Sequence, residues 1–170
     1  EGFDWAVSKT LSLDHSTMVP IHLAVPKGLP AVPVYISCGV APLISGVRCR
    51  QLGAMLARAV QAFPEERRVV ILGTGGVSHW VGMAKMGQVN VEFDRRVLRL
   101  VEEGNLAALV AMSDEEIVGQ AGNGALELRN WIVAMAALPR HRARLLAYET
   151  VEAWVTGLGF AELELPHTHE

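Results

Sequence analysis

The sequence predicts a single α/β domain in which a central, mostly β-sheet core is flanked by helices. Two kinds of segment indicate this fold. Short apolar runs bounded by turn residues are typical of buried strands, and longer stretches with apolar residues every three or four positions are typical of amphipathic helices. The composition agrees, since 51% of the 170 residues are hydrophobic. No repeat or linker divides the chain, so we place the domain at residues 1–165 and a frayed tail at 166–170.

Five apolar segments are predicted strands. They are residues 7–13, 32–38, 67–72, 145–148 and 154–156. The first ends at Asp14-His15, and the third runs into a glycine-rich turn that ends at His79. Because sites in α/β sheets are built at the carboxyl ends of strands, we expect His15 and His79 to lie at the functional site.

Four segments are predicted helices. They are residues 46–63, residues 91–103, a short helix from Ser113, and residues 124–138. Ser113, with Glu116 three residues later, is a capping-box pattern, and Asn123 is expected to cap the last helix. Four prolines between residues 20 and 33 predict that this stretch is broken into short pieces.

Charge and composition narrow the classes of partner. The net charge is −3 and no segment gathers Lys and Arg into a patch, so we expect neither nucleic acid nor an anionic membrane as a partner. No apolar run approaches the length of a membrane span, and the start lacks the pattern of an export signal. Cys38 and Cys49 are too few for a disulfide scaffold, so we interpret them as reduced thiols of a cytoplasmic protein.

The most informative segment is residues 69–79, V-V-I-L-G-T-G-G-V-S-H. Its glycines let the backbone turn sharply and approach another group closely. Three functions are considered: a dinucleotide-binding turn, a serine nucleophile at Ser78, and a general acid–base histidine at His79. The first two match poorly, because Ser78 replaces the third fingerprint glycine and the glycine of a nucleophile elbow is missing after it. An ordinary tight turn with a surface histidine also remains open.

Two further positions have both a functional and a structural interpretation. Glu127 lies in the first turn of an apolar helix, on the same side as Trp131, where a carboxylate is disfavoured unless it is paired, exposed or bound to a cation. It is either a metal ligand or a helix-edge residue that favours the helix dipole. Asp14-His15 is either part of a site or a satisfied turn, and His22, among apolar residues, is expected in the core.

Four motifs occur in a familiar order. They are D-H-S-T-M-V-P at 14–20, G-T-G-G-V-S-H-W at 73–80, A-G-N-G-A-L-E-L-R-N-W at 121–131 and Y-E-T-V-E-A-W-V-T-G-L-G at 148–159. Together they resemble the class III extradiol ring-cleavage dioxygenases, the family of the protocatechuate 4,5-dioxygenase beta subunit and of 2,3-dihydroxyphenylpropionate 1,2-dioxygenase. The resemblance covers essentially the whole chain, and the set is specific although each motif alone is weak.

The resemblance implies a role for three residues. Glu127 matches the carboxylate ligand of a non-haem Fe(II), and His79 matches the acid–base histidine near the catechol hydroxyls and bound oxygen. His15 matches a second histidine of the pocket, which hydrogen-bonds substrate or oxygen species. Family members often have glycine directly after this histidine, where the chain has Ser16, and we expect this departure to be tolerated.

A larger departure lies at the start of the chain. The family's two iron-ligating histidines precede the Asp-His motif, but only fourteen residues precede His15 here and none is histidine. The matched positions therefore do not supply a facial triad of two histidines and one carboxylate. Since the chain starts with Glu1 and not methionine, we expect it to be the C-terminal part of a larger α/β domain, with both histidine ligands in a segment absent here.

The resemblance implies extradiol cleavage of a catechol-type ring with O2, in aromatic-compound catabolism. We expect the chain alone to bind iron poorly, to be inactive, and to associate with the missing segment, a second subunit or another copy of itself. Two alternatives remain. One is a non-catalytic fragment or subunit of this fold that binds a partner or an aromatic ligand, and the other is a nicotinamide-dependent oxidoreductase.

Overall fold

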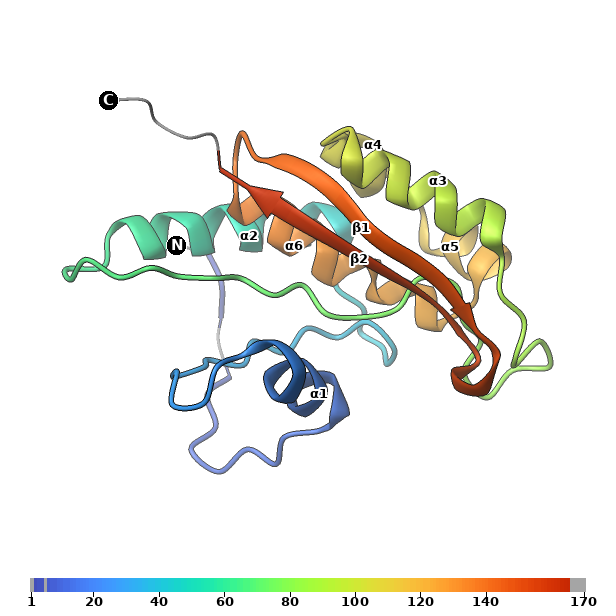
Figure 1. Cartoon of the computed structure of the whole chain (residues 1–170), viewed down its shortest axis with the longest axis horizontal. Coiled ribbons are helices and arrows are strands. Elements are labelled where there is room, and N and C mark those ends of the chain that lie inside the picture. Colours follow the sequence, from blue (N-terminus) through green and yellow to red (C-terminus); the bar gives the residue numbers. More distant parts are fainter. Residues whose placement is uncertain (1, 5, 166–170) are drawn as a thin grey trace.

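A β-hairpin lies across a set of helices, and an N-terminal segment that includes α1 lies to one side of them (Figure 1). The computed structural model describes residues 2–4 and 6–165. The helices are α1 (His15–Ala24), α2 (Gly46–Gln61), α3 (Val91–Glu102), α4 (Leu106–Ala111), α5 (Asp114–Ala121) and α6 (Leu128–Ala137), with the 3-10 turns η1 (Gly124–Glu127) and η2 (Glu152–Trp154). The strands β1 (Arg142–Val151) and β2 (Thr156–Glu164) pair antiparallel. The predicted α/β class is confirmed, with a sheet of two strands in the described part of the chain.

Side-chain caps fix where α2, α3 and α5 begin. Ser45 Oγ accepts the Arg48 N–H at 3.2 Å, and Ser113 Oγ accepts the Glu116 N–H at 3.1 Å. Asn90 caps α3 in the same way. Each bond satisfies one of the N–H groups that a helix start leaves unpaired. α2 and α3 lie within two residues of their predicted bounds, and α5 begins one residue after the predicted start at Ser113.

The last predicted helix forms, but the prediction that Asn123 caps it is wrong. Residues 124–127 form η1 and α6 follows. The Asn123 amide pairs instead with the backbone of Val81: Oδ1 accepts the Val81 N–H at 2.8 Å and Nδ2 donates to the Val81 carbonyl at 3.0 Å. This pairing ties the segment after His79 to the segment before α6.

The core lies between α2 and α6 and where α3 packs against the hairpin. One face of α3 carries Phe93, Val97, Leu98 and Val101, each 3% exposed or less. This is the three-four spacing of an amphipathic helix. Full burial of a side chain of this size contributes about 1.5–3 kcal/mol to stability. The helices after residue 45 and the hairpin therefore form one packed unit.

The three strands predicted in the first half of the chain do not form. Residues 7–13, 32–38 and 67–72 are irregular, and the hairpin is the one sheet in the described part of the chain. An extended segment becomes a strand only when its N–H and C=O groups pair with a neighbour, and no described strand pairs with these three. Most of their apolar side chains are exposed instead, with Val32 at 87% and Val70 at 81%, although Cys38 is buried at 7%.

The hairpin is longer than the two late strands that the sequence predicts. Residues 145–148 lie within β1. Of the predicted strand 154–156, only Thr156 belongs to β2, as its first residue. Before it, η2 and the left-handed Val155, with φ of 54°, reverse the chain. This turn could not be predicted from the sequence, because its left-handed position is occupied by valine and not by glycine or asparagine.

The N-terminal segment differs most from expectation. Residues 15–24 were expected to be broken by Pro20, but they form α1, and Asp14 caps this helix by accepting the Ser16 N–H at 3.1 Å. α1 has no buried residue, and His22, expected in the core, is exposed. α4 is a further helix that the spacing does not predict. The predicted frayed tail lies outside the described residues, and no helix within them is long and apolar enough to cross a bilayer.

Candidate functional site

The glycine turn passes directly beside Glu127. Gly75 has a φ of +124°, and a Cβ added there would lie 2.6 Å from the Glu127 Cβ, so only glycine fits. The next residue, Gly76, donates its N–H to Glu127 Oε2 at 2.8 Å. Trp131, one turn later on α6, donates its indole N–H to the Gly75 carbonyl at 3.3 Å. These contacts fix Glu127 and the turn against each other.

His79 rests on two glycines of the segment before α6. Its N–H donates to the Ala121 carbonyl at 2.8 Å, and its carbonyl accepts the Gly124 N–H at 3.1 Å. A Cβ added at Gly122 would lie 2.2 Å from the His79 carbonyl oxygen, and one added at Gly124 would lie 2.1 Å from His79 Nε2. The G-N-G part of the motif therefore leaves the space that the imidazole and its backbone occupy.

The imidazole of His79 is oriented by the backbone of its own turn. Nδ1 lies 2.9 Å from the Val77 carbonyl oxygen. A carbonyl only accepts, so Nδ1 carries the hydrogen and Nε2 of the neutral ring has the free lone pair. Nε2 lies 3.9 Å from Glu127 Oε2, and the side chains are 14% exposed for His79 and 40% for Glu127. The structure thus brings together two of the three predicted site residues.

His15 is not brought to this pair by any contact in the described part of the chain. It is the exposed first residue of α1. The start of α1 is bonded to Tyr35, whose hydroxyl lies 2.8 Å from Thr17 Oγ1 and 3.4 Å from Asp14 Oδ1. These contacts at the start of α1 are therefore with Tyr35, in the same N-terminal segment.

The dinucleotide interpretation of the turn lacks the arrangement that it needs. Such a turn opens directly into a helix whose N-terminus faces the pyrophosphate. The first helix after His79 is α3, which begins at Val91, and the residues between are irregular. The glycines serve the close approach to Glu127 and not a helix start.

Comparison with known proteins gives the family. The family model described as the catalytic LigB subunit of aromatic ring-opening dioxygenase matches residues 1–159. The chain belongs to the LigB family. The match includes all three predicted site residues, and it confirms the resemblance to class III extradiol dioxygenases.

Several relatives share one printed name, 2,3-dihydroxyphenylpropionate/2,3-dihydroxicinnamic acid 1,2-dioxygenase. The protein from Burkholderia vietnamiensis is 26% identical over 204 residues, covering 92% of this chain and 64% of that protein. The one from Paraburkholderia xenovorans is 28% identical over 204 residues with the same coverage, and the one from Photorhabdus laumondii is 25% identical over 211 residues, covering 96% and 66%.

This LigB-family chain spans slightly less than two thirds of the length of the curated relatives it matches. The alignments are also longer than the 170-residue chain itself. The relatives therefore carry residues within the matched range that have no counterpart here.

The described residues of this LigB-family chain supply one ligand of an iron site, and not the three ligands of a facial triad. Glu127 is half-exposed, and within the described residues it uses only Oε2 for a hydrogen bond, which leaves Oε1 for a cation. Hard oxygen ligands of this kind suit Fe(II) in a facial triad. Among residues 2–4 and 6–165, however, no group of three or more His, Cys, Asp or Glu side chains is placed to hold a metal ion.

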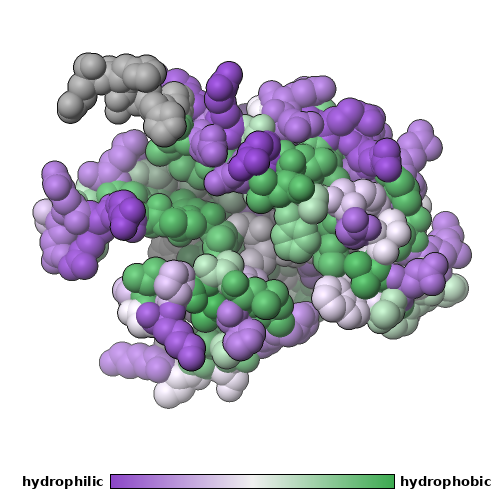
Figure 2. All heavy atoms as spheres, in the orientation of Figure 1, coloured by the Kyte–Doolittle hydropathy of each residue, from purple (hydrophilic) through white to green (hydrophobic). Residues whose placement is uncertain are grey.

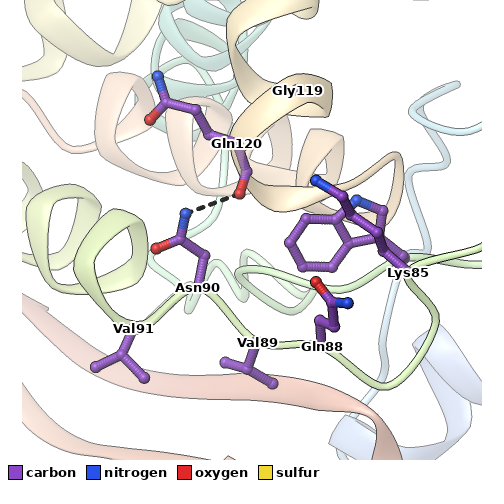
Figure 3. A pocket seen from close by; sticks show the side chains of 8 residues that line it. Lys85, Gln88, Val89, Asn90, Val91, Gly119 and Gln120 are labelled. Atoms are coloured by element: carbon purple, nitrogen blue, oxygen red, sulfur yellow. Dashed lines mark hydrogen bonds between the residues drawn. The ribbon is translucent and has the colours of Figure 1, made fainter.

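Neither His79 nor Glu127 is among the residues that line two cavities of the LigB-family chain. One, of about 550 Å³, is seen in Figure 3 and is lined in part by Trp80, Lys85, Gln88, Asn90 and Gln120. The other, of about 210 Å³, is lined in part by Arg50, Arg140 and His141. In the first, Asn90 Nδ2 donates to the Gln120 carbonyl at 2.9 Å, which joins the start of α3 to α5.

Sequence reasoning missed one residue beside the turn, Asp94. It is fully buried on α3 and bonded to Ser78. Burial raises the pKa of its carboxyl, while hydrogen bonds from Tyr148 and Ser78 act in the opposite direction. A signal was present, because Asp94 lies on the apolar face with Val97, Leu98 and Val101, where a carboxylate needs a specific partner.

Proposed function

We propose that this chain carries the acid–base half of an extradiol dioxygenase, which opens a catechol-type ring beside its two hydroxyls by inserting both atoms of O2 at a non-haem Fe(II) site. The observation that carries the proposal is the His79–Glu127 pair, 3.9 Å apart, in a chain of the LigB family. The printed name of the relatives, which describes a 1,2-dioxygenase of dihydroxylated aromatic acids, supports the same chemistry.

His79 is proposed as the general base and acid. Its Nδ1–H is held by the Val77 carbonyl, so the neutral ring presents Nε2 as an acceptor at the site. Nε2 takes a proton from a catechol hydroxyl and returns it during ring opening. The ring is mostly buried, and this lowers the competition from water for Nε2.

Glu127 is proposed as the carboxylate ligand. The Gly76 N–H holds Oε2, which aims the carboxylate without neutralising it. Fe(II), when bound, supplies neighbouring positions for the catechol oxygens and O2 and so removes the entropy cost of bringing them together. We propose that the two histidine ligands come from residues beyond the printed chain, since its described part offers no third ligand near Glu127.

His15 is proposed to complete the pocket as a hydrogen-bond donor to substrate or oxygen species. Its helix has no buried residue and presents Leu23 at 76% exposure. Figure 2 shows apolar residues on both sides of a hollow between the N-terminal segment and the body of the molecule. We propose that association with the remaining family segment, a second subunit or another copy covers this surface and fixes α1 relative to His79.

The proposed setting is the cytoplasm, with no nucleic-acid or membrane partner. Both cysteines are free and buried, as expected for a reducing compartment. The net charge of −3 does not favour binding to polyanions.

The test is iron content together with oxygen uptake in the presence of a catechol. The product of the complete gene should bind Fe(II) and consume O2 with formation of the yellow ring-opened product, whereas the 170-residue chain alone should bind iron weakly and consume little O2. Robust oxygen uptake by the reconstituted 170-residue chain would show that further ligands exist within it, and the ligand assignment would then be wrong.

A second candidate is a non-catalytic member of the fold that binds a partner or an aromatic ligand. The lack of a three-ligand group in the described residues favours it. The two candidates separate in the same experiment, since the non-catalytic protein binds neither iron nor O2 even as the complete gene product.

A further inference from the structure

A buried carboxylate holds the turn that carries His79. Asp94 is 0% exposed, and Ser78 donates to it twice, from its N–H to Oδ1 at 2.8 Å and from its hydroxyl to Oδ2 at 2.9 Å. The Tyr148 hydroxyl donates to Oδ2 at 2.8 Å. In the described part of the chain no Lys or Arg pairs with Asp94. A carboxylate buried without a cation is costly, so its hydrogen bonds must compensate.

Ser78, the main partner of Asp94, has every polar atom bonded. Besides its two bonds to Asp94, its carbonyl accepts the Gly157 N–H at 3.0 Å and its Oγ accepts the Asn90 N–H at 2.8 Å. The N-cap residue of α3, Asn90, and the second residue of β2, Gly157, therefore hold Ser78 from two directions. No rotation of the Ser78 backbone is possible without breaking a buried hydrogen bond.

The strand β2 leaves room for the carboxylate at one glycine. A Cβ added at Gly157 would lie 2.2 Å from Asp94 Oδ2. Gly157 also pairs with the turn on its other side, because its carbonyl accepts the Val77 N–H at 3.3 Å. The hairpin, α3 and the turn thus meet around Asp94.

The link from Asp94 to the imidazole is one peptide group. The N–H that Asp94 holds belongs to Ser78, and the carbonyl that orients His79 Nδ1 belongs to Val77, so both are in the Val77–Ser78 peptide. This group is planar, and its N–H and C=O point in opposite directions. Holding the N–H toward Asp94 therefore turns the carbonyl toward the imidazole.

We propose that Asp94 is a positioning residue for His79: by holding the Val77–Ser78 peptide, it fixes the carbonyl that keeps the hydrogen on Nδ1 and turns Nε2 toward Glu127. Only the role of His79 as the acid–base group rests on the proposed function. A purely structural role would change stability alone, so the test reads the tautomer of the imidazole itself.

The test is 15N NMR of the histidine side chains in the whole 170-residue chain, at a pH where the rings are neutral. His79→Gln assigns the His79 signals. In the unsubstituted chain, Nδ1 and Nε2 of His79 should give the well-separated pattern of a single Nδ1–H tautomer. Asp94→Ala should move the two resonances toward each other, as expected for a mixture of tautomers.

Two controls separate positioning from general loss of stability. Among the described residues, Tyr148 is the one donor to the Asp94 carboxylate outside the turn, so Tyr148→Phe should lower the melting temperature and leave the His79 pattern unchanged. His141 is an internal reference, because its Nδ1 lies 2.6 Å from the Leu138 carbonyl, remote from Asp94 in the fold. Its pattern should be the same in all variants.

If Asp94→Ala fails to fold, Asp94→Leu provides a side chain of similar volume without an acceptor, and Asp94→Asn keeps one acceptor for the Ser78 N–H. The tautomer should be lost in the first and kept in the second. An unchanged His79 pattern in a folded Asp94→Ala or Asp94→Leu chain overturns the proposal, as does an equal change in Tyr148→Phe. The measurement needs neither iron nor turnover, so its outcome is independent of whether the protein cleaves a ring.

Discussion

The two histidines proposed for one site are held in opposite ways. His79 is bonded through its N–H, its carbonyl and its ring, and glycines at 122 and 124 leave its space. His15 begins a helix without a buried residue, in a segment where Cys38 is the one buried side chain among the described residues 2–45. The comparison teaches that one proposed site residue, His79, is placed by the local fold alone, whereas the other, His15, needs further contacts to be placed.

The largest expected effect on activity is at Glu127, which is bonded to the same glycine turn that carries His79. In the complete gene product, Glu127→Ala should lose its bound iron and all measurable ring cleavage, because Glu127 is the proposed carboxylate ligand. Metal analysis and oxygen uptake measure both. Glu115→Ala, which removes an exposed carboxylate of α5 that is not part of the proposed site, is the matched control and should keep iron and activity. Retention of iron in the Glu127 variant contradicts the ligand role.

Next comes His79→Ala, which should keep iron and lower the rate about 10²–10⁴-fold, the usual effect of removing one general acid–base group. The same substitution at His15 tests the comparison directly. If association fixes α1 at the pocket, His15→Ala should also lower the rate in the complete protein. Loss of iron in the His79 variant would mean that His79 is a ligand and not a base.

A smaller effect separates the two regions by stability. Leu98→Ala removes a core side chain that is 2% exposed, and it should cost about 2–5 kcal/mol in the free energy of unfolding. Leu23→Ala makes the identical chemical change on α1, where the side chain is 76% exposed, and should stay within about 0.5 kcal/mol. Urea denaturation of the 170-residue chain measures both. Similar costs would show that α1 is packed more closely than its exposure indicates.

The smallest effect concerns the two thiols. Burial raises the pKa of Cys38 to about 11 and that of Cys49 to about 12, so both should react slowly with a thiol reagent at neutral pH. Each is measured alone in the variant that replaces the other with alanine. At low denaturant Cys38 should become reactive first, because it belongs to the loosely packed segment. Exposure of both thiols at the same denaturant concentration would show that the two regions unfold together.

Local patterns were enough to predict α2, α3, α5 and α6, but not α4. Ser45 and Ser113 act as caps, and the apolar spacing of α3 and α6 gives their buried faces. The strands predicted at 32–38 and 67–72 do not form. Apolar residues indicate only that a segment should be covered. Whether it becomes a strand depends on a neighbour with free N–H and C=O groups, and the relatives carry residues that this chain lacks.

The candidate site was predictable in part for a similar reason. His79 and Glu127 were expected together from motif order, and they lie 3.9 Å apart. The roles of Asp94 and Asn123 were not predicted, since each depends on a contact between segments far apart in sequence, with Ser78 in one case and Val81 in the other. A polar residue on an apolar helix face indicates that a buried contact exists, but it does not indicate which residue is the partner.

Gly124, beneath the imidazole of His79, has a consequence for directed evolution of this fold. Even alanine there would place a Cβ 2.1 Å from Nε2, so a library that varies this position samples displaced histidines and not new pockets. Lys85 and Gln88 are exposed side chains that line the cavity of about 550 Å³, so larger or smaller side chains there meet solvent. Randomisation confined to exposed residues such as these would change what the surface recognises while His79 keeps its place.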